Sequence, residues 1–177
     1  LINVQKKKLK GSKIKWIQNF NQIKAGPIIF FGNEFFDAIP IKQFTCEKNL
    51  LLEKCYVINP KTGLNEAYQA AAREDVAKIK TFEVLKGLKF IEYPKLGLIE
   101  MDKIVKKIKK QTGGILLIDY GYLNIINKST LQTVMKNKRI NMNSLLKNLG
   151  RADITSLVNF SLLEEYFKKE KMKVKKI

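Results

Sequence analysis

Two short apolar runs stand out from the polar pattern of the chain. The first lies in residues 26–44, which read GPIIFFGNEFFDAIPIKQF, and it becomes polar at Asn33, Glu34 and Asp37. A short apolar run bounded by Gly-Pro and a polar cluster is typical of a parallel strand buried on both faces. We therefore predict a buried strand over residues 27–32, with polar groups at its carboxyl end, where open α/β sheets bind ligands.

The second apolar run, residues 115–118, follows an amphipathic pattern over residues 98–110. Apolar residues at helical spacing predict a helix packed on a sheet, and Gly113-Gly114 is a typical helix end. A helix followed by a buried strand indicates a right-handed crossover onto a parallel sheet. The predicted fold class is therefore α/β.

A hairpin is expected after the first strand. Residues 41–47 and 50–58 flank Lys48-Asn49 and predict two antiparallel strands. The Asn-Pro-Lys-Thr-Gly stretch at residues 59–63 then breaks the pattern.

Both ends of the chain carry short periodic patterns. Residues 1–9 have helical apolar spacing, and residues 14–17 predict a short strand. Near the other end, Ser161-Leu-Leu-Glu164 fits a capping box for a helix that runs to about residue 171. Residues 172–177 alternate between apolar and basic, which predicts a half-exposed strand.

Length and composition indicate one domain. A chain of 177 residues with 45% hydrophobic residues is long enough for a single core. The pattern is weakest over residues 60–92, which we interpret as an insertion, although the alanine-rich residues 67–80 predict a helix. No apolar run reaches the roughly 18 residues that a membrane span needs, and the N-terminus has no signal pattern.

The chain has two cysteines, Cys46 and Cys55, and no histidine. This excludes a cysteine-histidine zinc site and a histidine general base, and we predict no metal. The two cysteines either pair across the hairpin or stay reduced and buried, as in a cytosolic protein.

The net charge of +18 first raises the question of nucleic acid. Lysine provides 31 of the 34 basic residues, and the arginines are Arg73, Arg139 and Arg151. Specific readout of phosphates and bases favours the arginine fork, so we expect no specific nucleic-acid partner. The dense runs at residues 6–10, 106–110 and 168–176 are typical of solvated helix faces. Nonspecific binding through lysine is the alternative, and it predicts an affinity that falls steeply with salt.

Four motifs, in order along the chain, carry a family resemblance. They are Asn33-Glu-Phe-Phe-Asp-Ala followed by Pro40 and Gln43-Phe44, GGILLIDYG at residues 113–121, Thr130-Leu-Gln132, and Ala152-Asp-Ile-Thr155. Together they resemble the MidA-type SAM-dependent methyltransferases, a family that includes mitochondrial assembly factors of respiratory complex I. The similarity covers nearly the whole chain and is weakest between about residues 60 and 90.

The resemblance implies part of a class I, Rossmann-like methyltransferase fold with a β-hairpin added after the Asn-Glu-Phe-Phe-Asp-Ala strand. It also implies S-adenosyl-L-methionine as cofactor and an arginine of a partner protein, such as a respiratory complex I subunit, as methyl acceptor. The excess of lysine, isoleucine and asparagine is typical of an AT-rich genome, which indicates a bacterial cytoplasmic protein. The mitochondrial matrix is the alternative location.

In such a fold the ends of the two apolar strands are neighbours, so Asn33-Glu34 and Asp119-Tyr120 are expected around one cleft. Glu34 and Asp37 are our candidates for gripping a guanidinium, because a carboxylate pairs with it bidentately. Asn33 is expected to orient the cofactor or the reacting nitrogen. Asp119 and Tyr120 are expected on the cofactor side.

Each candidate has a structural alternative. Glu34 and Asp37 can instead bind the amides of the following turn, and Asp119 can cap the next segment. The aromatics of the first run, Phe30, Phe31, Phe35 and Phe36, are expected in the core and not as a stacking surface. Four further residues match family motifs and either face the substrate or hold a loop: Thr130, Gln132, Asp153 and Thr155.

Departures from the family pattern point to an incomplete site. A SAM site needs a glycine-rich turn after its first strand and an acidic residue after its second, and the sequence has neither. In the family these parts precede the position of Leu1. We therefore interpret the chain as a C-terminal portion, also cut short after Ile177, that is inactive when isolated.

Two family histidines are also replaced, by Asn137 and Leu157. The alternative to an enzyme is thus a non-catalytic remnant or assembly factor that binds a partner protein.

Overall fold

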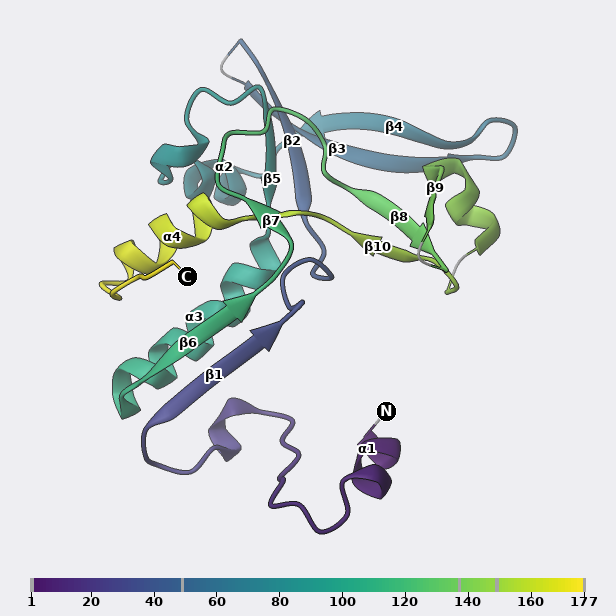
Figure 1. Cartoon of the computed structure of the whole chain (residues 1–177). Coiled ribbons are helices and arrows are strands. Elements are labelled where there is room, and N and C mark those ends of the chain that lie inside the picture. Colours follow the sequence, from purple (N-terminus) through teal and green to yellow (C-terminus); the bar gives the residue numbers. More distant parts are fainter. Residues whose placement is uncertain (1, 49, 137, 149, 177) are drawn as a thin grey trace.

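Two sheets of different type organise the chain (Figure 1). The computed structural model describes residues 2–48, 50–136, 138–148 and 150–176. One sheet is a parallel pair, β1 (Ile28–Asn33) and β6 (Gly113–Ile118), and the other is antiparallel with the order β4-β3-β2-β5. Helix α3 (Lys95–Gln111) connects the second sheet back to the first.

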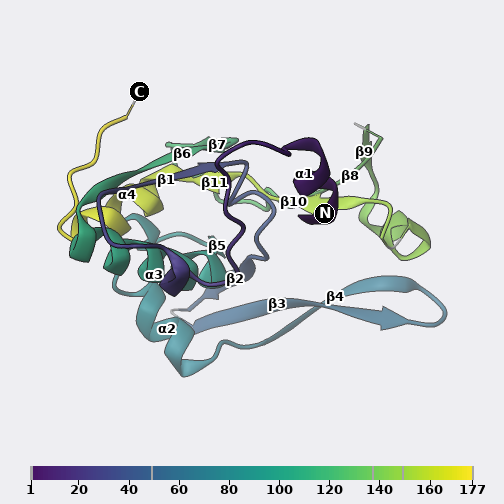
Figure 2. The same cartoon turned by 90° about the horizontal axis from the view of Figure 1, so that it is seen from below.

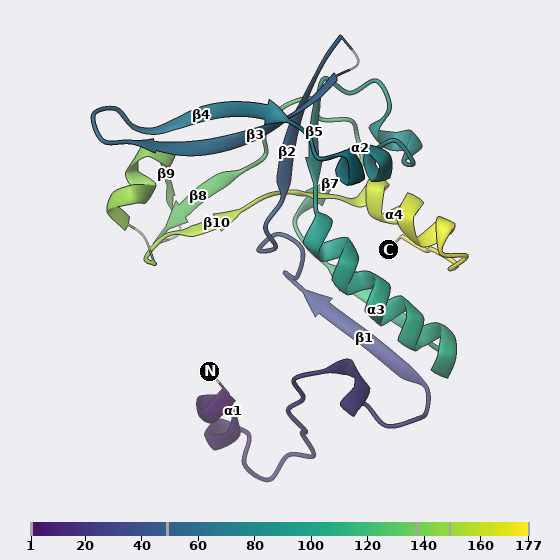
Figure 3. The same ribbon diagram turned by 180° about the vertical axis from the view of Figure 1, so that it is seen from behind.

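The parallel pair confirms the predicted strand, helix and second strand. β1 and β6 pair in register, with Phe31 opposite Leu116 and Asn33 opposite Ile118. Figures 1 and 3 show α3 running along one face of this pair. On the inner face Phe30, Ile115 and Leu117 pack against the hydrophobic core. Both strands therefore end at the same edge of the sheet.

The outer face of the same pair is exposed, which corrects the prediction that both faces are buried. Ile29 is 81% exposed and Phe31 60%, and on β6 Leu116 and Ile118 are also exposed. The physical reason is that α3 covers one face and no described residue covers the other. The prediction that Phe31 belongs to the core is wrong for the same reason.

The antiparallel sheet contains the predicted hairpin. Its strands are β2 (Lys42–Glu47), β3 (Leu50–Asn59), β4 (Gly63–Ala70) and β5 (Phe90–Tyr93). In the hairpin turn Lys48 has a positive φ of 47°, and Asn49 lies outside the described residues. Figure 2 shows the long β3–β4 hairpin extending away from the body of the molecule.

The alanine-rich stretch divides between a strand and a helix. Residues 67–70 belong to β4, whereas α2 (Arg73–Ile79) and the short helix η2 (Glu83–Leu85) follow. The helix predicted over residues 67–80 is therefore correct only in its second half, because the first half pairs with β3. The interpretation of residues 60–92 as an insertion stays a prediction.

Smaller elements complete the chain after β6. β7 (Gly121–Tyr122) pairs with β11 (Val158–Asn159) in parallel. A separate sheet has the order β10-β8-β9, from β8 (Gln132–Met135), β9 (Lys138–Ile140) and β10 (Asp153–Thr155), with the short helix η3 (Met142–Asn148) beside it. Asn137 lies outside the described residues.

The last helix, α4 (Phe160–Lys169), begins earlier than the predicted capping box. Its N-cap is Asn159, whose side chain accepts a hydrogen bond from the backbone N–H of Leu162 at 3.0 Å. Ser161 instead donates to the backbone oxygen of Leu123, and Glu164 pairs with lysines. The capping-box prediction is wrong because asparagine two residues earlier already satisfies the first turn.

Near the chain ends the two predicted helices are confirmed, as α1 (Ile2–Lys8) and as α4, which ends two residues before the predicted residue 171. Residues 14–17 and 172–176 are not strands, since neither segment finds a partner strand. A short helix, η1 (Phe20–Gln22), leads into β1. Leu1 and Ile177 lie outside the described residues.

The core lies between the antiparallel sheet, α3 and α4, where Phe44, Met101, Val105 and Leu162 are almost fully buried. Both cysteines are free and half-buried. Within the described ranges, no helix is long and apolar enough to cross a membrane.

Candidate functional site

The carboxyl ends of β1 and β6 meet, as the sequence predicts. The backbone N–H of Glu34 donates to the backbone oxygen of Ile118 at 2.9 Å, which joins the two strand ends. Asn33 and Glu34 are exposed, and Glu34 has a positive φ of 47° that starts a sharp turn. Tyr120, at the end of β6, is 66% exposed.

Asp119 holds the turn that follows β1. Its Oδ2 accepts hydrogen bonds from the backbone N–H of Phe35 at 3.0 Å, of Phe36 at 2.8 Å and of Asp37 at 3.4 Å. Its Oδ1 accepts one from the N–H of Tyr120 at 2.9 Å. These are the contacts of the capping alternative for Asp119.

Asp37 is half-buried, and its Oδ1 is a buried atom with no hydrogen-bond partner among the described residues. Burial raises the pKa of Asp37 above its ordinary value of 3.8, and the charges of Asp119 and Glu34 raise it further, against the opposing effect of the Ala38 amide. Three carboxylates thus lie close enough to influence one another at the strand ends.

The carboxylates at the strand ends have no ion-pair partner among the described residues, although the chain has 34 basic and 16 acidic residues. Elsewhere in the described part of the chain, nine acidic side chains form ion pairs: Glu53, Glu66, Glu74, Asp75, Glu83, Glu100, Glu164, Glu165 and Glu170. In the described part of the chain Glu34, Asp37 and Asp119 form none. The turn after β1 is therefore an anionic site within a strongly basic protein.

A further carboxylate, Glu92 on β5, was not identified from the sequence. It is only 8% exposed, and its Oε1 accepts from Gln43 Nε2 at 2.8 Å and from the backbone N–H of Thr130 at 2.9 Å. Its Oε2 accepts from Thr130 Oγ1 at 2.5 Å. The one local signal was a charged residue in an apolar strand directly before Tyr93-Pro94.

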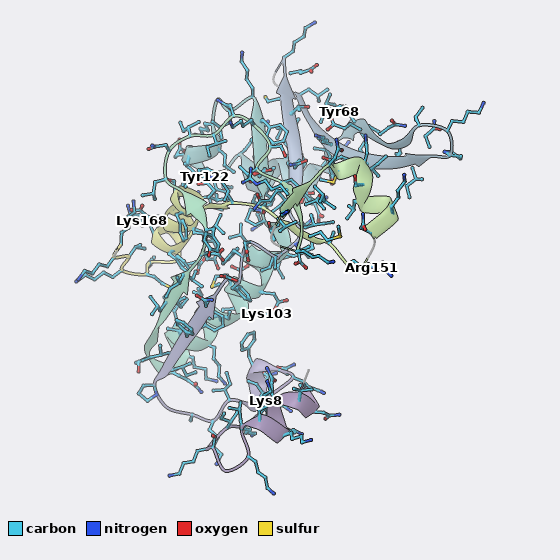
Figure 4. All side chains as sticks on the ribbon, turned by 45° about the vertical axis from the view of Figure 1, so that its right-hand side comes forward. Lys8, Tyr68, Lys103, Tyr122, Arg151 and Lys168 are labelled. Atoms are coloured by element: carbon cyan, nitrogen blue, oxygen red, sulfur yellow. The ribbon has the colours of Figure 1, made fainter. Side chains whose placement is uncertain are left out.

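Glu92 lines a cavity of about 20 Å³, which is room for about one water molecule. Tyr122 forms part of the wall, and Figure 4 shows it beside α4. Burial, with the charge of Glu92, raises the pKa of Tyr122 to about 12, although the Asn159 side chain opposes this. The Tyr122 phenol therefore stays protonated in the physiological range.

The cavity adjoins the turn after β1. Phe36 lines it, and the backbone N–H of Ser156, another lining residue, donates to the backbone oxygen of Asp37 at 3.0 Å. Leu157 also lines the cavity, and its backbone N–H donates to Thr130 Oγ1 at 3.0 Å.

The four residues from the later motifs do not gather in one place. Thr130 belongs to the Glu92 network. Gln132 Nε2 donates to Thr155 Oγ1 at 3.1 Å across the β8–β10 pair, and Asp153 is exposed at the other end of β10. The contacts of Gln132 and Thr155 are those of residues that hold a loop.

Gly121 allows β7 to approach β11 closely. A Cβ atom at this position would lie 2.2 Å from the backbone oxygen of Val158 and 2.6 Å from the Phe160 ring. The absence of a side chain at Gly121 therefore serves the close pairing of β7 with β11.

We expect Gly121→Ala to separate β7 from β11 and to lower the free energy of unfolding by about 1–3 kcal/mol, as overpacking does. Urea unfolding measures this. Gly114→Ala is the matched control, because its added Cβ would have no described atom within 4 Å. Equal stability of the two variants would contradict the close approach.

Within the described residues, no group of three or more cysteine, aspartate and glutamate side chains is arranged to hold a metal ion.

A family model described as a putative S-adenosyl-L-methionine-dependent methyltransferase matches residues 1–177. The chain belongs to this methyltransferase family. A Rossmann-like methyltransferase fold agrees with the parallel β1–β6 pair and its α3 crossover.

Two curated relatives carry the name protein arginine methyltransferase NDUFAF7 and are mitochondrial. The chain is 25% identical over 155 residues to the Danio rerio protein, covering 88% of this chain and 36% of that protein. It is 29% identical over 170 residues to the Caenorhabditis elegans homologue, covering 89% of this chain and 37% of that protein. The chain thus spans little more than a third of the length of these relatives.

Two solved structures from Burkholderia thailandensis share the fold. One, bound to S-adenosyl-homocysteine, has a TM-score of 0.63 at 18% identity, over 88% of this chain and 40% of that chain. The other, a native structure, has a TM-score of 0.66 at 17% identity, over 95% of this chain and 46% of that chain.

Proposed function

We propose that Glu34 and Asp37, in the turn after β1, form the acceptor side of a SAM-dependent methyltransferase that methylates an arginine of a partner protein. The observation that carries the proposal is that Glu34 and Asp37, after β1, form no ion pair with the described residues. Basic residues outnumber acidic ones two to one, yet no described Lys or Arg neutralises this pair. A cationic ligand is the chemistry that complements such a site.

Asp37 is the candidate for receiving the proton of the reaction. The cofactor supplies a methyl group on a sulfonium, and in the transfer a bond forms between carbon and a guanidinium nitrogen while the carbon–sulfur bond breaks. The product loses one proton, which the Asp37 carboxylate accepts; its Oδ1 has no hydrogen-bond partner among the described residues. A raised pKa makes this carboxylate a better proton acceptor than an ordinary aspartate.

The described residues fit one side of the cofactor. Asn33 and Tyr120 are exposed at the strand ends, and the exposed apolar face of β1 and β6 lies beside them. A parallel sheet is normally covered on both faces, and the relatives are more than twice as long as this chain. We therefore place the glycine-rich side of the cofactor site on a segment outside these 177 residues.

The names of the relatives extend the proposal to a partner and a location. They indicate a protein acceptor, and a respiratory complex I subunit is the acceptor that the family resemblance implies. The bacterial cytoplasm and the mitochondrial matrix are the two locations that fit. A non-catalytic remnant that binds a partner protein is the competing function.

Calorimetry with SAM separates the two functions. We expect the longest natural polypeptide that carries these residues to bind one SAM per chain, with S-adenosyl-homocysteine as competitor. The 177-residue segment alone should bind more weakly, since it supplies one side of the site. Absence of SAM binding by the longest polypeptide would contradict the enzyme and favour the remnant.

A further inference from the structure

Two carboxylates among the described residues are buried, Asp75 and Glu92, and only Asp75 has positively charged partners. Asp75 is 1% exposed, and its carboxylate pairs with Lys42 at 2.8 Å and with Lys95 at 2.7 Å. Glu92 is 8% exposed, and in the described part of the chain it forms no ion pair. A buried charge without a countercharge is costly, so proteins normally pair it.

Neutral donors hold Glu92 in place without cancelling its charge. They are the Gln43 amide, the Thr130 backbone N–H and the Thr130 hydroxyl. Gln43 Nε2 also contacts Ser129 Oγ at 2.7 Å, and Thr130 Oγ1 accepts from Leu157, so the network is fixed from three segments. Such support is typical of a side chain that is positioned for a ligand.

One oxygen of Glu92 retains acceptor capacity. Oε1 accepts two hydrogen bonds, whereas Oε2 accepts one, from Thr130 Oγ1. A carboxylate oxygen has two lone pairs, so Oε2 can accept another donor. The cavity that Glu92 lines has room for about one small group.

The cavity wall suits the end of a planar cation. Phe36 and Tyr122 are aromatic, and the polar side chain of Asn159 lies on the same wall. Guanidinium groups stack on aromatic faces and donate hydrogen bonds from their edges. The Ser156 contact to Asp37 places this cavity directly behind the proposed acceptor turn.

We propose that Glu92 is a second anionic subsite for the methyl acceptor: one NH₂ end of the acceptor's guanidinium enters the cavity and donates to Oε2. Glu92 thereby determines specificity for a cationic acceptor. This inference rests on the proposed function. It adds a buried residue on β5 to Glu34 and Asp37 of the turn after β1.

Ligand-observed NMR titration tests the subsite. The probes are N-acetyl-L-arginine amide and the matching citrulline amide, which has nearly the same shape without the charge. The protein is the longest natural polypeptide that carries these residues. We expect arginine amide to bind at least 10-fold more tightly than citrulline amide.

Glu92→Gln should lower the affinity for arginine amide about 10-fold, because glutamine keeps the size and loses the charge. Glu47→Gln is the matched control, since it makes the same change and removes one negative charge from an exposed position on β2. It should leave the affinity unchanged. Far-ultraviolet circular dichroism and thermal unfolding check that both variants fold.

Three results would overturn the inference. The first is equal binding of the two amides by the unmodified protein, a result that does not depend on the folding of any variant. The second is unchanged binding of arginine amide by Glu92→Gln. The third is a loss of arginine amide binding in Asp37→Asn but not in Glu92→Gln. The last result would confine the acceptor to the β1 turn and leave the proposed function standing. SAM binding, measured separately, tests that function independently of Glu92.

Discussion

Asp37→Asn is expected to lower the rate of methyl transfer by about 10²- to 10⁴-fold, which is the usual contribution of a positioned proton acceptor. The substitution keeps the size of the side chain and removes its ability to take the proton from the guanidinium. The measurement is the turnover rate with methyl-labelled SAM. SAM affinity should stay close to that of the unmodified protein, because Asp37 faces the acceptor in this account.

The pH dependence of the methyl-transfer rate is a second test of the role of Asp37. Because burial and two neighbouring carboxylates raise the pKa of Asp37 above 3.8, the rate should fall as the pH decreases through that raised value. Asp37→Asn should lack this limb of the profile, whereas Glu47→Gln, at an exposed position on β2, should retain it. An unchanged profile in Asp37→Asn would remove Asp37 from the reaction.

Asp119→Ala is expected to disorder the turn after β1 and lower the free energy of unfolding by about 2–3 kcal/mol. The substitution leaves the backbone N–H groups of Phe35, Phe36 and Asp37 without the carboxylate that they contact. The estimate is moderate because Asp119 is half-buried and water can reach part of the turn. Urea unfolding measures the loss.

Asp119→Asn is the control for this change. Its amide oxygen can still accept from the turn, but a neutral acceptor makes weaker hydrogen bonds than a carboxylate. We expect a loss of stability between those of the unmodified protein and of Asp119→Ala. If Asp119→Ala is as stable as the unmodified protein, the turn is held by other contacts.

The sequence predicted the elements that rest on local pattern. The apolar run of β1, the helical spacing of α3 and the Gly113-Gly114 break imply a parallel pair by themselves. Strands that are parallel neighbours end at one edge, so the proximity of Asn33-Glu34 and Asp119-Tyr120 followed from the pattern as well.

The sequence did not predict the roles of residues that depend on contacts with distant parts of the chain. Glu92 becomes a candidate only through Gln43, 49 positions away, and Thr130, 38 positions away. Ile29 and Phe31 have the pattern of a buried strand, yet their exposure depends on what covers the sheet. Residues 14–17 have the pattern of a strand but do not form one, since a strand also needs a partner strand, which the local pattern does not identify.

The chemical identity of the methylated residue tests arginine methylation most directly. The longest natural polypeptide that carries these residues is incubated with methyl-labelled SAM and with undermethylated protein from its own cells, and the labelled protein is hydrolysed to amino acids. We expect label in methylated arginine, and we expect this label to be lost with Asp37→Asn. Label in another amino acid, or labelled arginine that persists in Asp37→Asn, would contradict this expectation.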